Sequence, residues 1–233
     1  QGKNTLSSSD YKAGDRIPTK NGKYYMVIFG MSMDRAPSVI TKATKFDKVY
    51  CVGDSRTADT KMALGVAVPS NVEFIAKWGE GLYWFKSTGY RQLLSSVSKQ
   101  PKNSKKAVII NLGVNDLNNG RAYVTYMKKV AANLRKYNCK MYYLSVNPVN
   151  SAMIKSVGGK ARSEAQIASF NRTIYKNLCS GKNKSFTYIN SCTNLQMKGW
   201  ISNRHDMGIY DGLHYSNATY LRIFDYCMRY LNR

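Results

Sequence analysis

Short, almost continuously apolar runs alternate along the chain with stretches whose apolar residues recur at helical spacing. The runs that suit strands are Val49–Val52, Val72–Ala76, Ala107–Leu112, Met141–Val146 and Phe186–Ile189. Runs without polar alternation are typical of strands buried on both faces of a parallel sheet. The amphipathic stretches predict helices over Thr57–Leu64, Tyr90–Val97, Ala122–Tyr137, Glu164–Leu178 and Asn217–Leu231. This alternation predicts an α/β fold with a parallel sheet and right-handed crossovers.

The first 45 residues do not follow this pattern. They contain turn residues, Gly14, Pro18 and Gly22, and one apolar stretch, Tyr24–Gly30, that suits a strand. The opening segment is polar and Ser-rich, as in a linker or tail. We therefore expect an N-terminal extension over residues 1–45 that packs on a main domain formed by residues 46–233.

The chain is strongly basic. Its 233 residues include 36 Lys and Arg against 13 Asp and Glu, which gives a formal net charge of +23. Acidic residues are missing from 117 to 163 and again from 165 to 205, so the bias is regional as well as global. A positive surface attracts polyanions, and an anionic cell-wall polymer is one such partner, although many wall-associated proteins are simply basic. No zinc-finger spacing, aromatic RNA-binding strand or compact basic helix indicates specific nucleic-acid recognition.

The cysteines and the apolar runs bear on the cellular setting. None of the 5 cysteines forms a CxxC pair, so we expect no structural zinc site. Cys51 lies in an apolar run and is expected to be buried. The other four cysteines allow one disulfide, and the sequence does not select the pair. No apolar run approaches the ~18 residues of a membrane-spanning helix. A chain that begins at Gln1 with a polar segment fits a processed protein, and we expect it to be extracellular or cell-wall associated.

Polar residues follow two of the predicted strands and precede the last helix. The blocks are Gly53-Asp54-Ser55, Gly113-Val114-Asn115-Asp116 and Asp211-Gly212-Leu213-His214. Functional residues of parallel sheets gather at the carboxyl ends of the strands. A Ser there can act as a nucleophile, an Asn amide can donate to an oxyanion, and a carboxylate three residues before a His can orient the imidazole. Each block alone is also typical of a turn, but together they predict a nucleophilic site. The other histidine of the chain, His205, is interpreted as a surface residue.

The order Ser, Asn, Asp, His resembles the SGNH hydrolases, the GDSL-type esterase and lipase superfamily. The resemblance runs from about Val49 to the C-terminus, and the family's remaining block, a Gly after the second strand, would fall in Lys77-Trp78-Gly79-Glu80-Gly81. It implies a three-layer α/β/α sandwich with a five-stranded parallel sheet, the flavodoxin-like SGNH hydrolase fold, to which the N-terminal extension is added.

The resemblance also implies roles for individual residues. Ser55 would be the nucleophile, His214 the proton carrier and Asp211 the residue that holds His214 in the correct tautomer. The oxyanion hole would combine the backbone N–H groups of Ser55 and Gly79 with the side-chain amide of Asn115. No metal and no other cofactor is implied.

Several residues near these blocks keep more than one interpretation. Gly81 is the alternative to Gly79 in the oxyanion hole. Asp54 and Asp116 are expected to fix their loops by hydrogen bonds. Arg56 stands where the family usually has Leu, and it would either bind an anionic substrate group or be exposed. The aromatic residues after the second strand, Trp78, Tyr83, Trp84 and Phe85, suit either stacking on sugars or core packing. The candidate substrate-binding residues are Arg56, Gly81 and Trp84.

The resulting prediction is a serine esterase that removes short acyl groups, most simply acetyl, from a carbohydrate or polysaccharide through an acyl-enzyme. Two alternatives stay open. One is an O-acetyltransferase that uses the same site on a cell-wall or surface polysaccharide, and the other is a catalytically idle polyanion-binding protein. The expected substrate is an acylated carbohydrate or another small ester, and we expect the chain to be a monomer.

Overall fold

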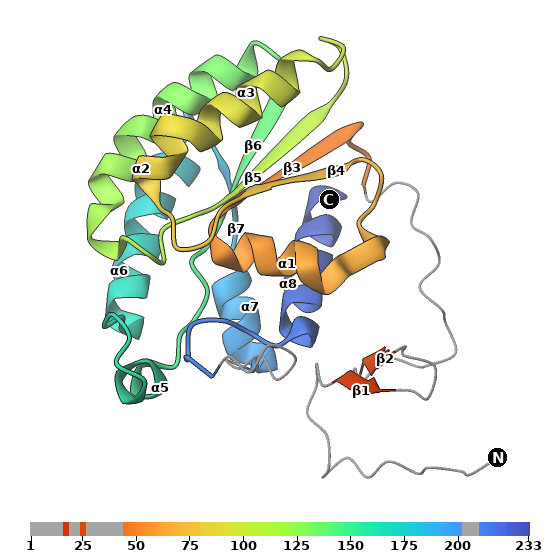
Figure 1. Cartoon of the computed structure of the whole chain (residues 1–233). Helices are drawn as coiled ribbons and strands as arrows, with labels where there is room; N and C mark the ends of the chain where they lie inside the picture. Colours follow the sequence, from red (N-terminus) through yellow and green to blue (C-terminus); the bar gives the residue numbers. More distant parts are fainter. Residues whose placement is uncertain (1–15, 19–23, 27–43, 202–209) are drawn as a thin grey trace, which may run out of the picture.

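The computed structural model describes residues 16–18, 24–26, 44–201 and 210–233 (Figure 1). A five-stranded sheet with the order β4-β3-β5-β6-β7 forms its centre, and every neighbouring pair is parallel. The strands are β3 (Lys48–Gly53), β4 (Val72–Ala76), β5 (Lys106–Asn111), β6 (Cys139–Leu144) and β7 (Thr187–Ile189). The parallel sheet predicted from the apolar runs is confirmed.

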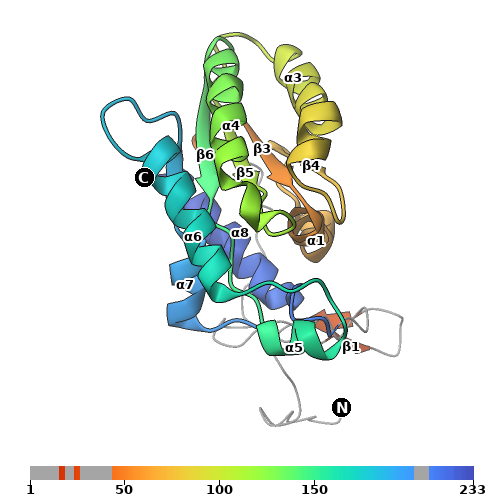
Figure 2. The ribbon, with the colours of Figure 1, turned by 90° about the vertical axis from the view of Figure 1, so that its left-hand side faces the viewer.

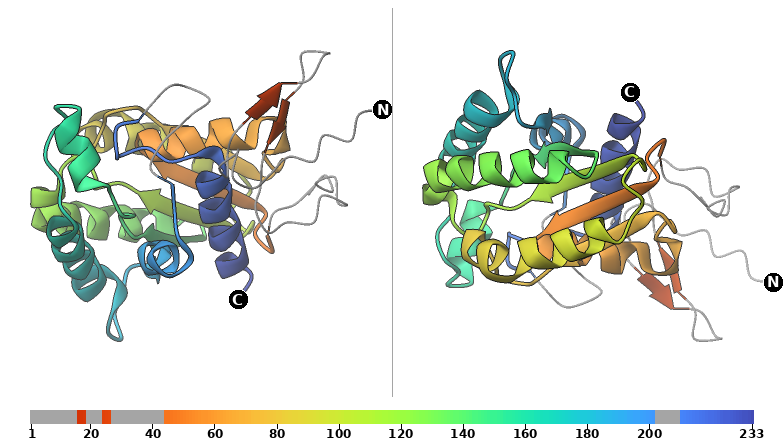
Figure 3. Two further views of the ribbon diagram at one scale, coloured as in Figure 1. Left: turned by 90° about the horizontal axis from the view of Figure 1, so that it is seen from below. Right: turned by 90° about the horizontal axis from the view of Figure 1, so that it is seen from above.

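Helices cover both faces of this sheet, which makes the three-layer sandwich (Figures 1 and 3). One face carries α1 (Ser55–Leu64), α7 (Ser191–Lys198) and α8 (Asn217–Leu231). The other carries α3 (Tyr90–Ser98), α4 (Gly120–Arg135) and α6 (Glu164–Ile174). Figure 2 looks onto this second layer, where α4 lies between α3 and α6.

Two hydrophobic cores explain why the strands lack polar alternation. In β3, Tyr50 and Val52 belong to the core under α3, α4 and α6. Their neighbours Val49 and Cys51 belong to the core under α1 and α8. Successive side chains of a strand point to opposite faces, so a sheet covered on both faces buries every position.

The order of the strands places a topological switch point at β3. The chain passes from β3 to β4 on one side and then returns to β5 on the other. The loops that follow these strands therefore diverge in opposite directions from the carboxyl edge of the sheet. Ligands of open α/β sheets bind in the crevice that forms at such a point.

Short elements lie between the predicted ones. They are α2 (Leu82–Trp84), which continues through a π-helical turn into α3, and α5 (Ser151–Ser156), together with α7. The predicted helix over Glu164–Leu178 divides into α6 and a π-helical turn, Tyr175–Cys179. These helices are too short to show a clear apolar period. The side chains of Asn150 and Asn190 cap α5 and α7, whereas α2 begins after Gly81 without a side-chain cap.

The N-terminal region is described only in part. Strands β1 (Arg16–Pro18) and β2 (Tyr24–Met26) pair antiparallel. The strand expected over Tyr24–Gly30 is thus seen for its first three residues, and residues 27–30 lie outside the described part. The packing of residues 1–45 on the main domain stays a prediction.

All five cysteines are buried and their thiols are free. The disulfide that the sequence allowed among four of the cysteines is therefore not formed in the structure. Burial raises the pKa of Cys51 to about 12, which fits the expected small apolar side chain. Among the described helices, none combines the length and the apolar character that crossing a bilayer requires.

Candidate active site

The predicted triad residues come together at the carboxyl edge of the sheet. Ser55 is the first residue of α1, separated from the end of β3 by Asp54 alone, and Asp211 and His214 lie in the loop before α8. Helices α1 and α8 pack against each other, which brings the two segments together although they are distant in sequence. Ser55 Oγ lies 2.8 Å from His214 Nε2, and His214 Nδ1 lies 2.6 Å from Asp211 Oδ2. This is the hydrogen-bonded order of nucleophile, base and orienting carboxylate.

Backbone donors fix the orienting carboxylate. Asp211 Oδ1 accepts hydrogen bonds from the backbone N–H groups of Leu213 at 2.8 Å and His214 at 2.9 Å. Burial raises the pKa of Asp211, but the hydrogen bonds from the His214 ring and the backbone outweigh it, so the pKa lies well below its usual range. Gly212 permits this turn, because its φ is +70° and a Cβ would lie 2.5 Å from the carbonyl oxygen of Asn150. Asp211 is therefore ionised and aimed at the imidazole.

The strand-to-helix turn before Ser55 is equally tight. A Cβ on Gly53 would lie 2.0 Å from Thr57 Oγ1 and 2.5 Å from the carbonyl oxygen of Asn111, so only glycine fits. Asp54 caps α1 by accepting the N–H of Arg56 at 3.0 Å. Burial raises the pKa of Asp54 to about 6, and the Arg56 charge limits the rise. The expected loop-fixing contact of Asp54 is present.

Asp116 joins the loop after β5 to the loop after β4. Its carboxylate accepts the backbone N–H of Leu82 at 2.9 Å and the hydroxyl of Tyr123 at 2.7 Å. Asn115 makes a second bridge, since its Nδ2 donates to the carbonyl oxygen of Glu80 at 2.8 Å. The loops that carry the predicted oxyanion donors are thus tied to each other.

The two candidate glycines of the loop after β4 differ in their surroundings. Gly79 has φ +72°, and no atom lies within 4 Å of where a Cβ would stand. At Gly81 a Cβ would lie 2.5 Å from Asp116 Oδ2, so the carboxylate already fills this space. The open side of Gly79 favours it as the glycine that substrate approaches, and Gly81 serves the packing of the loop.

The structure corrects the interpretation of Arg56, which is only 3% exposed. Its guanidinium donates to the backbone carbonyl oxygens of Leu213, Asn147 and Pro148 at 2.9 to 3.1 Å. It also lies over the Tyr215 ring, 4.7 Å from the centroid. Arg56 is neither exposed nor open to an anionic substrate, because the main chain around the triad occupies it.

The interpretation of Trp84 is corrected as well. Its side chain is 4% exposed and belongs to the core under α3 and α4, so it is not available to a substrate. An exposed ring near the site is that of Trp78, which is 42% exposed. The centroid of its ring lies 5.3 Å from that of His214, with 31° between the planes. Trp78 directly precedes Gly79, and this adjacency to a candidate oxyanion glycine is the signal that could have distinguished it from Trp84.

Arg162 is a site residue that the sequence analysis missed. It lies between α5 and α6, and its Nη2 donates to Asn115 Oδ1 at 2.9 Å. No motif or spacing marked it, because it stands in an irregular loop. His205, expected at the surface, lies outside the described residues.

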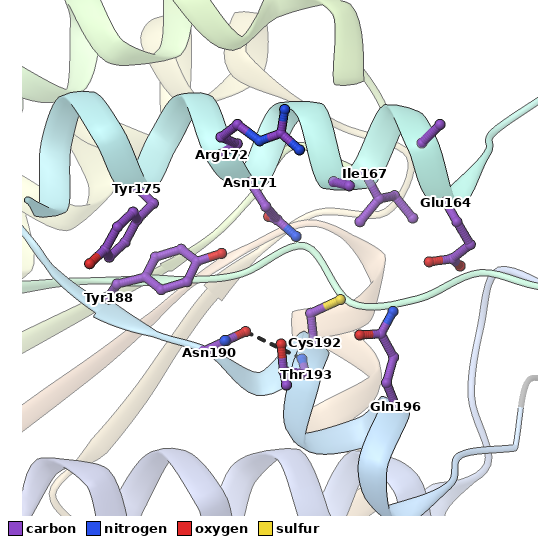
Figure 4. Close-up of a pocket in the computed structure, with 12 residues that line it drawn as sticks. Glu164, Ile167, Asn171, Arg172, Tyr175, Tyr188, Asn190, Cys192, Thr193 and Gln196 are labelled. Atoms are coloured by element: carbon purple, nitrogen blue, oxygen red, sulfur yellow. Dashed lines mark hydrogen bonds between the residues drawn. The ribbon is translucent and has the colours of Figure 1, made fainter.

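A separate open groove of about 780 Å³ lies between α6, β7 and α7 (Figure 4). Tyr175 and Tyr188 line one end, with ring centroids 5.3 Å apart, and Glu164 and Gln196 line the other. The lining contains no member of the triad, so this groove is distinct from the catalytic arrangement.

Solved structures share this fold at low sequence identity. A GDSL-like lipase from Bacteroides thetaiotaomicron has 16% identity and a TM-score of 0.56, with 79% of this chain and 86% of that chain covered. An acetyl xylan esterase, AlAXEase, has 16% identity and a TM-score of 0.53, with 79% and 99% covered. TesA has 16% identity and a TM-score of 0.51, with 79% and 97% covered. A comparison with curated protein sequences finds no match.

A family comparison covers most of the chain. The profile of the GDSL-like Lipase/Acylhydrolase family matches residues 49–227, from the first strand of the sheet to the last helix. The matched region contains all three sequence blocks and the strands that carry them. The chain therefore belongs to the GDSL-like lipase/acylhydrolase family of SGNH hydrolases and is an enzyme that acts on ester bonds.

Proposed function

We propose that the protein is a serine esterase that removes acetyl groups from a carbohydrate. The single observation that carries the proposal is the hydrogen-bonded chain from Ser55 Oγ through His214 to Asp211, with the exposed Trp78 ring beside the imidazole. The chain of hydrogen bonds supplies the nucleophile, and the ring supplies an apolar surface where the alcohol part of the ester would lie.

The proposed reaction has two halves. Ser55 Oγ attacks the ester carbonyl while its proton passes to His214 Nε2, and Asp211 stabilises the resulting imidazolium. The tetrahedral intermediate collapses, the C–O bond to the sugar breaks, and His214 returns the proton to the leaving alkoxide. Water then attacks the acetyl-serine with His214 again as base, which releases acetate and restores the Ser55 hydroxyl.

Three donors are proposed to hold the oxyanion: the N–H groups of Ser55 and Gly79 and the Asn115 amide. Ser55 begins α1, and the N–H groups in the first turn of a helix have no intrahelical partner. The positive end of the helix dipole adds to their effect. Asn115 Nδ2 uses one hydrogen for Glu80, which leaves the other for the substrate.

An exposed indole ring next to the catalytic imidazole favours a sugar as the alcohol part of the ester. Carbohydrate rings have apolar C–H faces that can pack on an aromatic ring, while their hydroxyls stay in water. Binding sites commonly combine such apolar surfaces with a few placed polar groups. The similar structure described as an acetyl xylan esterase suggests acetylated xylo-oligosaccharides as the first test substrate.

The Trp78→Ala variant is expected to lose carbohydrate preference. We expect the ratio of kcat/KM for an acetylated xylo-oligosaccharide to that for p-nitrophenyl acetate to fall about tenfold, since one lost stacking surface is worth about 1–2 kcal/mol. Trp78→Phe should keep most of the ratio. Tyr83→Ala is the matched control, because Tyr83 is 83% exposed in the same segment. An unchanged ratio in Trp78→Ala would contradict the proposed sugar platform.

The same acyl-enzyme can pass its acetyl group to a sugar hydroxyl instead of water. Product analysis with an unacetylated oligosaccharide present distinguishes these outcomes, because hydrolysis gives free acetate and transfer gives a newly acetylated sugar. We propose hydrolysis as the main outcome, and a predominance of acetylated sugar would favour an O-acetyltransferase.

The charges on the outward face of α4 favour the proposal that the acetyl groups are carried by an anionic polymer. Such a polymer is in keeping with an extracellular or wall-associated enzyme. The exposed cations of α4 and of its C-cap, Lys136, form two rows with seven-residue spacing: Arg121, Lys128 and Arg135, and beside them Lys129 and Lys136. Seven residues of helix correspond to about 10 Å, so each row is a line of regularly spaced charges. No described residue forms an ion pair with these side chains. We propose that this basic face of α4 retains an acidic polysaccharide.

Reversing two of these charges is expected to weaken that retention. Lys128→Glu/Lys129→Glu should bind polygalacturonate at least tenfold more weakly than the wild type, with a shallower salt dependence, because fewer counterions are released. Lys182→Glu/Lys184→Glu changes the charge equally in a different exposed segment and should bind nearly as the wild type. Equal weakening in both variants would indicate unlocalised attraction. Stronger binding of single-stranded DNA than of polygalacturonate would contradict a glycan partner.

A further inference from the structure

We propose that Arg162 is a positioning residue of the oxyanion hole, which holds the Asn115 amide so that its N–H faces the substrate. The inference rests on the proposed function, because it assigns Asn115 the role of an oxyanion donor. Arg162 itself is not proposed to touch the substrate.

Arg162 holds the loop after β5 at two points. Its Nη2 donates to Asn115 Oδ1 at 2.9 Å, and its Nε donates to the backbone carbonyl oxygen of Val114 at 2.7 Å. Its Nη1 donates to the carbonyl oxygen of Lys160 at 3.0 Å, which closes its own loop. The planar guanidinium thus contacts both the side chain and the main chain of the Asn115 segment, a geometry that an ammonium group cannot reproduce.

These contacts decide which way the Asn115 amide points. A guanidinium can only donate, so the group that faces Arg162 must be the oxygen. The opposite end, Nδ2, then donates to the carbonyl oxygen of Glu80 at 2.8 Å and retains one free hydrogen. Rotation of the amide by half a turn would place its oxygen toward the developing oxyanion, which would repel it. Arg162 excludes the rotated orientation because it must face the amide oxygen, and the Glu80 carbonyl excludes it because it must face the amide N–H.

The segment that carries Arg162 is itself anchored. Ser163, the next residue, caps α6 and forms a reciprocal capping box with Gln166. Glu164 accepts the backbone N–H of Val149 at 3.0 Å, which ties the start of α6 to the loop after β6. The guanidinium is therefore presented from a fixed backbone, as a positioning group requires.

The charges around the guanidinium are mixed. Burial lowers the pKa of Arg162, the nearby Arg56 charge lowers it further, and Asp54 and Asp211 raise it. Arg162 forms no ion pair with a described carboxylate, and its donors go to neutral oxygens. Its positive charge polarises the Asn115 amide toward the substrate, which strengthens the remaining N–H as a donor.

A double-mutant cycle tests the proposal with p-nitrophenyl acetate. Asn115→Ala is expected to lower kcat by about 10²–10³, the usual effect of losing one oxyanion donor. Arg162→Ala should lower kcat at least tenfold with little change in KM, and Arg162→Lys should restore part of it. In Asn115→Ala/Arg162→Ala, the second change should cost less than twofold, because the group on which Arg162 acts is already absent. Arg172→Ala is the control, an exposed Arg on α6.

The outcomes separate the two levels of the argument. If the fold-losses in kcat of the two single variants multiply in the double variant, the positioning role of Arg162 is overturned and the proposed function still stands. The positioning role is also overturned if Arg162→Ala loses activity only to the extent that its Tm falls and Arg162→Lys restores none of that activity. An Asn115→Ala variant with wild-type kcat would overturn the oxyanion assignment, and the inference about Arg162 with it.

Discussion

Replacing Ser55 with alanine is expected to lower kcat/KM for p-nitrophenyl acetate by about 10⁴ or more, because the hydroxyl that would form the acyl-enzyme is removed. Ser55 Oγ is hydrogen-bonded to His214 Nε2 at 2.8 Å, and without this hydroxyl the imidazole has no nucleophile to deprotonate. Binding of the ester and the oxyanion donors would survive, so a small residual rate above that of water is expected. The wild type should turn over the acetyl ester faster than the butyryl ester.

Mass spectrometry gives a second readout of the same prediction. Brief reaction of the wild type with the ester should leave one acetyl group on the peptide that contains Ser55, and Ser55→Ala should leave none there. Ser98→Ala, a change at an exposed position of α3, should behave as the wild type. If Ser55→Ala kept more than a tenth of the activity, another nucleophile would have to act, and the proposed mechanism would be wrong.

The sheet and the triad were predictable because their signals are local. Val49 to Val52 of β3 are all buried between two helical layers, so this part of the strand appears in the sequence as an unbroken apolar run. Ser55 and Asn115 stand in short blocks where parallel strands end, and His214 stands in a short block directly before the last helix. The loops there need glycines and short polar residues, and those residues identify the blocks.

Residues whose partners are distant in sequence were not predictable. Arg56 is buried by carbonyl groups of residues 147, 148 and 213, and nothing within its own segment indicates them. Trp78 and Trp84 stand six positions apart in one aromatic segment, yet one lies over His214 and the other enters the core. Arg162 acts through the amide of Asn115, which the chain brings close only after folding.

Replacing Arg56 with alanine is expected to lower the free energy of unfolding by about 3 kcal/mol or more. The change would leave buried carbonyl groups without a donor, and each such group costs about 1–3 kcal/mol. It would also remove the contact with the Tyr215 ring. Because stability of a domain is only about 5–15 kcal/mol, this single change removes a large part of it. Denaturant titration followed by tryptophan fluorescence measures the loss.

The conservative variant keeps the argument testable if Arg56→Ala does not fold. Arg56→Lys retains the charge but cannot donate to three separated carbonyl groups, so it should be destabilised by a smaller, measurable amount. Arg91→Ala, at an exposed position of α3, should change stability by no more than about 0.5 kcal/mol. Because Leu213 lies between Asp211 and His214, loss of the Arg56 contact should also loosen the triad loop and lower kcat in both Arg56 variants. An Arg56→Ala protein as stable and as active as the wild type would show that the carbonyl groups find other donors, and that the loop holds its geometry without the guanidinium.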